Sequence, residues 1–534
     1  MTVWIGLIVL GLGLGGSLFM PVPQNLKTNF DAGQSLYALG EYEGAILEYN
    51  KIVSFQEQSR NNWAVRTDSV RVSFGDDLEL PVIAAAWYQL GNAYKRSGKH
   101  EEAVGAYRQV MDVKGVQSDF RSLVQFQVAE TRFLQKEYSE ATKEYKKYVE
   151  LFPDTEEAGK AFFYSGWSEF NLKQYDRAIE TLLAMLEAYP EDRYASDSQF
   201  RIASSHYAKG EYQEAVDQAH LVLDKYPNSP VIAQAVYLKA NAFDQLGYDE
   251  QAIAAYREVR DLYDRMFELL RGSFREGKNV DFEDYRQLFE TSSLRVAEIF
   301  RKTNQYENAY KELIAAQETA EERFYKAKVQ MRMGDNYLEW ERYENAYNTY
   351  NQVIELYSDT PYPSSAQYYK GEARYYGGDF AEARKEYLGV LENYPDSDTD
   401  LRAAALYTAA WSSEKLGEAE EALKHYSRVV ESFSRSDQAP RCLLRIAWLN
   451  QEKQNIPEAL KAYESISQNY PDSREVADAY YGLGRLYREE GRLDEAIDAF
   501  SKVGRDARET YIAALIEAAN IHIKEGRSAE GKQL

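Results

Sequence analysis

A single alanine position recurs through this 534-residue chain at nearly constant intervals, and this period limits the possible folds more than any other feature. The alanines are Ala45, Ala103, Ala141, Ala178, Ala215, Ala252, Ala309, Ala346, Ala383, Ala422, Ala459 and Ala496. Most intervals are 37 residues, with one of 38, one of 39 and two long ones of 58 and 57. The period predicts about twelve repeats, each of which buries its apolar face against its neighbours instead of in one central core.

Each repeat reads as two antiparallel helices, which we name helix A and helix B. The stretch from Trp87 to Val110 shows this best, with Leu90-Gly91 in its first half and Ala103 in its second. Large residues fill the space between helices, while glycine and alanine let the two helix axes approach closely. No alternating apolar-polar stretch is long enough to predict a sheet, and prolines number only 13. We therefore expect an all-α fold of the solenoid type.

Short links join one repeat to the next, and they often contain an aromatic residue, a proline and a small polar residue. Examples are Phe152-Pro153-Asp154-Thr155 and Tyr394-Pro395-Asp396-Ser397. Proline stops helix B because it has no N–H to donate. We expect the following Asp, Ser or Thr to cap the next helix A. Within a repeat, a glycine such as Gly98 or Gly210 predicts a left-handed turn between helices A and B.

From about Phe30 to Lys524, these motifs resemble the tetratricopeptide repeat (TPR) superfamily. The 37-residue period and the Tyr-Pro-Asp-Ser type of link look like its bacterial envelope subgroup, which includes a Tol-Pal-associated coordinator and outer-membrane assembly lipoproteins. The resemblance implies a right-handed superhelix whose A helices line a concave groove. It also implies a scaffold that binds other proteins or peptides in that groove.

The two long intervals and the chain ends divide the sequence into four predicted parts. Residues 1–23 form a hydrophobic segment, and residues 24–259 hold repeats 1–6 with an insertion at 56–80. We expect that insertion to extend helix B and then form a loop or short hairpin. Residues 260–291 are expected to lengthen two helices into a projecting arm. Residues 292–534 hold repeats 7–12 and an incomplete last repeat.

The first segment contains an uncharged run from Val3 to Met20, about the shortest length that spans a bilayer as a helix. No Lys or Arg precedes the run, so it differs from an ordinary signal peptide. We interpret it as a hydrophobic helix that serves as a signal-anchor or as an atypical signal peptide. A mis-assigned start codon is the alternative.

The formal net charge of -23 argues against a nucleic-acid partner and against broad contact with anionic lipid, so we expect membrane contact through the N-terminal segment alone. The five histidines are dispersed, and no catalytic or metal-ligating constellation is recognisable. We expect no enzyme activity, no metal and no cofactor.

Cys442, the single cysteine, is either a perturbed thiol or a small buried residue, and the latter is favoured. The sequence carries no signal for the oligomeric state.

Aromatic residues recur at three positions of helix A and are the candidates for partner binding. They also have a structural interpretation, since such rings can pack between successive helices. The functional interpretation is a groove that binds a peptide through aromatic contacts. The candidates are Phe163, Trp167, Phe170, Phe200, Tyr207, Tyr237, Tyr368, Tyr375, Tyr407, Trp411, Trp448 and Tyr481.

Taken together, the sequence predicts a non-enzymatic interaction scaffold, either membrane-anchored or periplasmic, in the bacterial cell envelope. The alternative is a cytosolic or membrane-attached regulatory adaptor that forms part of a longer chain with a further C-terminal domain.

Replacing Leu7, Val9 and Leu14 with Asp tests the predicted envelope address. Three charges in the apolar run should prevent membrane insertion or export, and the variant should be recovered in the cytosolic fraction. Quantitative blotting of cell fractions measures this. Unchanged recovery in the membrane or envelope fraction would contradict the interpretation.

Overall fold

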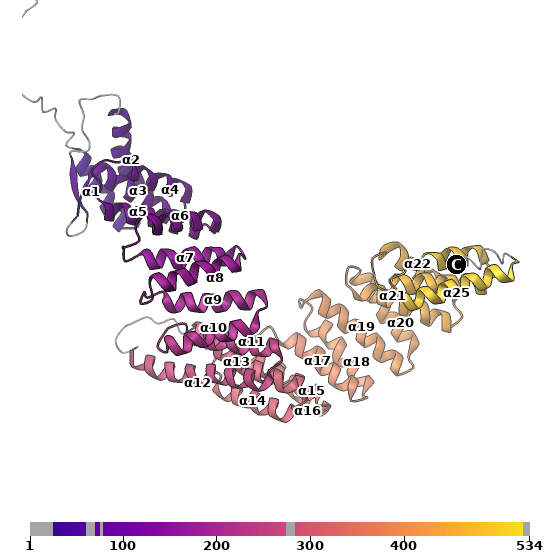
Figure 1. Cartoon of the computed structure of the whole chain (residues 1–534). Coiled ribbons are helices and arrows are strands. Elements are labelled where there is room, and N and C mark those ends of the chain that lie inside the picture. Colours follow the sequence, from indigo (N-terminus) through magenta and orange to yellow (C-terminus); the bar gives the residue numbers. More distant parts are fainter. Residues whose placement is uncertain (1–24, 60–69, 75–77, 274–282, 527–534) are drawn as a thin grey trace, which may run out of the picture. The chain divides into compact units, whose positions relative to one another are not determined.

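The computed structural model describes residues 25–59, 70–74, 78–273 and 283–526. Twenty-five helices and one two-stranded hairpin occupy these ranges. The chain divides into two compact units, Met1–Leu262 and Tyr263–Leu534, and the division falls within one helix, α12. Figure 1 shows helices as the dominant element of both units. The prediction of an all-α solenoid is confirmed.

The elements that begin in unit 1 are α1 (Asn25–Ala38), α2 (Tyr42–Ser59), β1 (Arg71–Phe74), β2 (Leu78–Pro81), α3 (Val82–Arg96), α4 (His100–Met111), α5 (Ser118–Leu134), α6 (Tyr138–Leu151), α7 (Ala158–Asn171), α8 (Tyr175–Ala188), α9 (Ala195–Lys209), α10 (Tyr212–Lys225), α11 (Ile232–Leu246) and α12 (Asp249–Ser273). Odd-numbered helices are the A helices of the repeats, and even-numbered helices are the B helices. Each helix packs against the next in sequence, and A helices also contact the following A helix, as α7 contacts α9.

Unit 2 continues the same alternation. Its helices are α13 (Glu283–Lys302), α14 (Tyr306–Thr319), α15 (Arg323–Glu339), α16 (Tyr343–Leu356), α17 (Pro363–Tyr376), α18 (Phe380–Asn393), α19 (Thr399–Lys415), α20 (Ala419–Ser432), α21 (Gln438–Glu452), α22 (Ile456–Asn469), α23 (Val476–Glu489), α24 (Leu493–Ser501) and α25 (Arg508–Lys524). Within this unit, α13 contacts α15, and α17 and α21 both contact α19.

The recurring alanines mark the centre of each helix pair. All twelve have an exposed fraction of 0%. In several of these pairs, a ring of helix B also packs directly on a glycine of helix A. A Cβ atom added at Gly91 would lie 2.5 Å from the Tyr107 ring, and one at Gly334 would lie 2.4 Å from the Tyr350 ring. Glycine is required here because any side chain would push the two helices apart.

The hydroxyl group of the same helix-B tyrosine forms a second contact between the two helices. It donates a hydrogen bond to the side chain that follows the glycine on helix A. Tyr107 donates to Asn92 over 2.7 Å, and Tyr350 donates to Asp335 over 2.8 Å. A buried phenol thus gains a partner, which avoids the cost of an unsatisfied polar group in the core.

The turns between helices A and B use the left-handed region that the glycines predict. Gly98 has φ 75°, and the next amide, of Lys99, donates to the Tyr94 carbonyl over 2.9 Å. The same turn occurs without glycine in five repeats, for example at Lys136 with φ 63°. The glycine signal therefore finds only part of these turns, because a packed helix pair also holds a non-glycine residue in this strained conformation.

The expected capping of helix A is wrong for the link at 152–155, but an Asp does cap the helix after the second link. Asp398, directly after Ser397, is the N-cap residue of α19, and its carboxylate accepts hydrogen bonds from the amides of Asp400 and Leu401 over 2.9 and 3.0 Å. The N-cap residue of α7 is Glu157, whose side chain makes no capping hydrogen bond. Thr155 instead donates its hydroxyl to the Phe152 carbonyl over 2.9 Å, and Ser397 does the same to Tyr394 over 2.7 Å. These two hydroxyls close the turn after helix B.

The first insertion takes the hairpin form. β1 and β2 pair antiparallel, with Phe74 opposite Leu78. The Phe74 ring packs against Tyr88 and Phe120, with ring centroids 5.5 and 5.3 Å away, so the hairpin is part of the first core of unit 1. At the second insertion, α12 has 25 residues and α13 has 20, against 14 in many other helices. The projecting arm there remains a prediction, and its centre lies outside the described residues.

The predicted N-terminal hydrophobic helix, residues 1–23, also lies outside the described residues. Within the described ranges, no helix combines the length and the apolar character that a bilayer-spanning segment needs.

Two glycines of one repeat give a matched test of the packing. Gly91→Ala should destabilise unit 1 by about 1–3 kcal/mol because its new methyl group overlaps the Tyr107 ring. Gly105→Ala, on the exposed face of α4 with no atom within 4 Å of the added Cβ, should stabilise it by about 0.5–1 kcal/mol. Thermal melting followed by circular dichroism should show shifts of opposite sign. A shift of the same sign in both variants would contradict the packing argument.

Candidate functional site

The twelve candidate residues all lie on A helices, but their exposure differs. Phe163 is a core residue with an exposed fraction of 3%, whereas Trp448 is exposed to 44%. The other ten are half-buried. Most of these twelve aromatic side chains, which we call the aromatic ladder, therefore pack against neighbouring helices with one part and face solvent with the other.

Four candidate rings of the first helix-A position pack on the core ring of their own helix B. The ring centroids of Tyr368 and Tyr387 are 5.4 Å apart, and those of Tyr407 and Tyr426 are 5.8 Å apart. Tyr237 and Tyr481 make the same kind of contact. Rings of the third position cover the turn to helix B, as Phe170 does with Tyr175 and Tyr207 with Tyr212 at 5.4 and 5.3 Å. These contacts stabilise each repeat internally.

Some candidates are also brought together between repeats. In unit 1, the Arg201 guanidinium of α9 lies near Phe200 on its own helix and near the Trp167 ring of the preceding A helix, α7. Within α7, the Trp167 ring lies 5.6 Å from that of Phe163. In unit 2, Trp411 donates through Nε1 to the Tyr375 hydroxyl over 2.5 Å.

A cationic side chain that sequence reasoning missed connects the two candidate tryptophans of unit 2, Trp411 and Trp448. The Arg445 guanidinium lies 4.7 Å from the Trp411 ring and 4.4 Å from the Trp448 ring. Both its Nε and its Nη2 donate to the Glu414 carboxylate, which also accepts from the Tyr426 hydroxyl over 2.5 Å. Such an Arg–aromatic stack fixes the orientation of the rings.

Trp448 separates two neighbouring cavities on the A-helix face of unit 2. One cavity of about 590 Å³ is lined by residues of α19, α20 and α21, including Trp411 and Glu452. The other, of about 470 Å³, is lined by residues of α21, α22 and α23, including Tyr481. Both are large enough to take a side chain of a partner.

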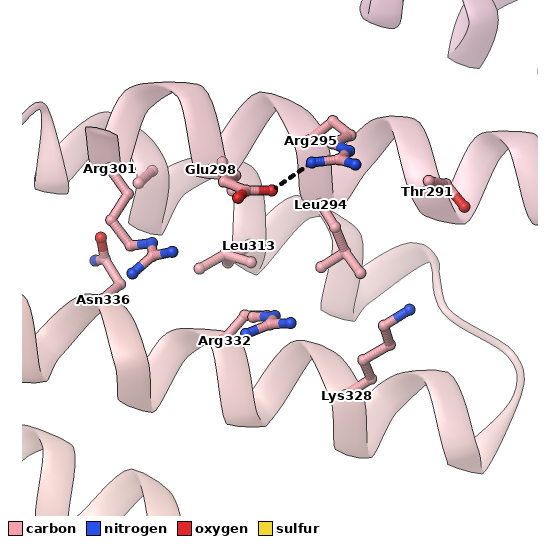
Figure 2. Close-up of a pocket in the computed structure, with 11 residues that line it drawn as sticks. Thr291, Leu294, Arg295, Glu298, Arg301, Leu313, Lys328, Arg332 and Asn336 are labelled. Atoms are coloured by element: carbon pink, nitrogen blue, oxygen red, sulfur yellow. Dashed lines mark hydrogen bonds and ion pairs between the residues drawn. The ribbon is translucent and has the colours of Figure 1, made fainter. Parts of the chain in front are cut away.

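A third cavity, of about 350 Å³, lies among α13, α14 and α15, and it is unusually basic for so acidic a chain. Figure 2 shows Lys328 and Arg332 extending from α15 toward α13, with Leu294 and Leu313 between the helices. Arg295 and Arg301 complete the set of cations. The signal that sequence reasoning overlooked is the period itself, since Arg295 and Arg332 are 37 residues apart.

Most of this positive charge is already compensated within the chain. Arg295 pairs with Glu298 over 2.9 Å, Arg332 pairs with Asp335 over 2.9 Å, and Arg301 pairs with Glu339. Lys328 makes no such ion pair with any other described residue. The cavity can therefore accept an anionic group, but with only one cation free of an ion pair.

The carboxylates of the A-helix face serve the core more than the surface. Glu372 accepts a hydrogen bond from Tyr387 over 3.1 Å. Burial raises the pKa of Glu372, and the hydrogen bonds from Tyr387 and Tyr368 oppose this rise. Asp335 accepts from Tyr350 in the equivalent way. Neither arrangement offers the paired acid and base of a hydrolytic site.

Cys442 lies at the start of α21 and is fully buried, next to Leu406, Tyr426 and Val429. Burial raises the pKa of its thiol far above the ordinary value. The interpretation as a small buried residue is confirmed. Among the residues that the structure covers, no cluster of three or more His, Cys, Asp or Glu side chains is placed to hold a metal ion.

Comparisons with protein families identify the repeats. The pattern of the YfiO family, described as an outer membrane lipoprotein, matches residues 156–386. Two tetratricopeptide repeat patterns match 372–441 with 444–510, and 84–113. No curated protein sequence gives a significant match.

Solved structures also align with this chain, at low identity and low TM-score. The C-terminal part of a TPR protein from Cytophaga hutchinsonii is 16% identical, with a TM-score of 0.36 over 52% of this chain and 98% of its own. Yeast Tom70 is 15% identical, with a TM-score of 0.33 over 94% and 96%. A tetratricopeptide repeat protein from Parabacteroides merdae is 12% identical, with a TM-score of 0.32 over 51% and 92%.

Cys442 provides a simple check of core packing in unit 2. The native protein should not react with Ellman's reagent over minutes, because the thiol is shielded from solvent and stays protonated. In guanidinium chloride, one thiol per chain should react at once. Rapid reaction of the native protein would show that the thiol lies at the surface.

Proposed function

Because this chain belongs to the tetratricopeptide repeat superfamily, we propose that it is a non-enzymatic protein–protein interaction scaffold of the bacterial cell envelope. Its A-helix face binds segments of partner proteins. The YfiO-type match over residues 156–386 and the apolar run at the N-terminus support the envelope setting.

The observation that carries the binding proposal is the exposed ring of Trp448. Large apolar side chains at a protein surface cost free energy, and tryptophan is prominent among the residues that dominate binding at interfaces. Trp448 is held in place by Arg445 and flanked by two cavities, so its ring is already oriented for contact. Little conformational entropy would be lost when a partner binds.

The arrangement of the other rings supports an extended or helical peptide as the bound form. Trp411 and Tyr481 line the cavities on either side of Trp448. A peptide that follows the A helices could place one side chain in each cavity. No acid–base pair accompanies these residues, which fits binding without chemistry.

Site-specific photo-crosslinking tests this proposal. A photoreactive residue at Glu452, which is exposed and lines both cavities, should form adducts with partner proteins in cells. The added change Trp448→Ala should reduce the adducts about tenfold, since a central aromatic residue of an interface often contributes 2 kcal/mol or more. Mass spectrometry of the adducts identifies the partners.

The control is a photoreactive residue at Leu356, exposed to 54% near the end of the B helix α16, which should give none of these adducts. Trp448→Ala should melt within a few degrees of the parent protein. Adducts that persist unchanged in the Trp448→Ala variant would refute binding at this surface.

A further inference from the structure

Among the described residues, an arginine that stacks on a tryptophan 34 positions earlier occurs once in each unit. Arg201 follows Trp167 by 34 residues, and Arg445 follows Trp411 by 34 residues. In both cases the tryptophan lies on one A helix and the arginine on the next, from α7 to α9 and from α19 to α21. The guanidinium-to-ring distances are 4.9 Å for Arg201 and 4.7 Å for Arg445.

The two stacks differ in the residue three positions after the tryptophan. In unit 2 this residue is Glu414, whose carboxylate accepts two hydrogen bonds from Arg445. In unit 1 it is Phe170, whose ring lies 4.9 Å from the Arg201 guanidinium. One stack therefore contains its own anion, and the other contains a second aromatic ring.

Arg201 is left without the partner that Arg445 has. Among the described residues, its guanidinium makes no hydrogen bond and no ion pair within 4 Å, and its Nε is buried without an acceptor. Asp197, one turn earlier on α9, is the carboxylate whose charge acts on Arg201, but it is not in contact with it. The side chain as a whole remains partly exposed, so an outside group can reach it.

A guanidinium that is largely removed from water and faces only rings is a site for an anion. Cation–π contacts compensate part of the lost hydration, and a bidentate carboxylate compensates more. Burial lowers the pKa of Arg201, which reflects the same lost hydration. The group that completes the equivalent stack of unit 2 is a carboxylate, so the molecule itself indicates the matching chemistry.

We propose that the Trp167–Phe170–Arg201 cluster of unit 1 binds an acidic side chain of a partner protein, whose carboxylate has the role that Glu414 has beside Arg445. This inference rests on the proposed scaffold function and adds the chemistry of one subsite. The rings hold the aliphatic part of the acidic side chain, and Arg201 pairs with its carboxylate. Partners that place Asp or Glu at this point are favoured over those with Asn or Gln.

The test compares two labelled peptides on the full-length protein. Both have twelve residues, one alternating Leu with Glu and the other alternating Leu with Gln. Fluorescence anisotropy is measured at about 0.15 M salt, where charges beyond about 8 Å are screened and the overall negative charge matters little. The Glu peptide should bind about tenfold more tightly than the Gln peptide, as expected for a hydrogen-bonded charge pair.

Four variants locate the effect. Arg201→Gln should remove the preference for the Glu peptide. Phe170→Glu should remove it as well, because it supplies the internal carboxylate that unit 2 already has. Phe170→Gln, which loses the same ring without adding charge, should keep the preference. Arg193→Gln removes an exposed cation near Tyr194 outside the cluster, and it should also keep the preference.

Equal affinities of the two peptides for the unaltered protein would overturn the inference, as would a preference that survives Arg201→Gln. If Phe170→Glu melts at a far lower temperature than Phe170→Gln, its fold is damaged, and the inference is then judged from the Arg201→Gln variant alone. The scaffold proposal is judged separately, since crosslinking at Glu452 takes place in unit 2. Intact crosslinking with no peptide preference would reject the acidic subsite and leave the scaffold standing.

Discussion

In the repeats that have a glycine at this position, the contact between that glycine of helix A and a ring of helix B sets how closely the two helices pack. It occurs between Gly91 and Tyr107, between Gly334 and Tyr350, and between Gly371 and Tyr387. The close approach places the phenol hydroxyl beside the residue after the glycine, so that residue becomes a hydrogen-bond acceptor. Acceptors such as Asp335 and Glu372 on the A helices are thus explained by core packing.

The surface available for binding is what remains after the repeats have packed. Phe163 is buried in the core, and the rings that cover the turns are half-buried. Trp448 is exposed because Arg445 and Glu414 hold it from one side while the cavities leave the other side open. The same set of rings therefore serves packing and binding. A buried ring such as Phe163 packs in the core, and an exposed ring such as Trp448 is available to a partner.

Repetition also allows one structural device to serve two purposes. The tryptophan–arginine stack in unit 2 is neutralised by Glu414, so it works as a structural pair. In unit 1 the matching position holds Phe170 in place of a glutamate, so Arg201 has no carboxylate to pair with there. The residue three positions after the tryptophan thus distinguishes the two stacks. Glu414 makes one an internal ion pair, and Phe170 leaves the other open to a partner's carboxylate.

The sequence alone determined the helix pairs, their number and their spacing, because the recurring alanine lies at the same place in every repeat and its period can be read along the chain. It also located the turns with glycine and the hairpin insertion. It did not predict the turns at residues such as Lys136, the role of Thr155 in closing a turn, or the exposure of Trp448. These depend on contacts between residues on different helices, such as Trp411 and Arg445, that approach each other only when the repeats stack.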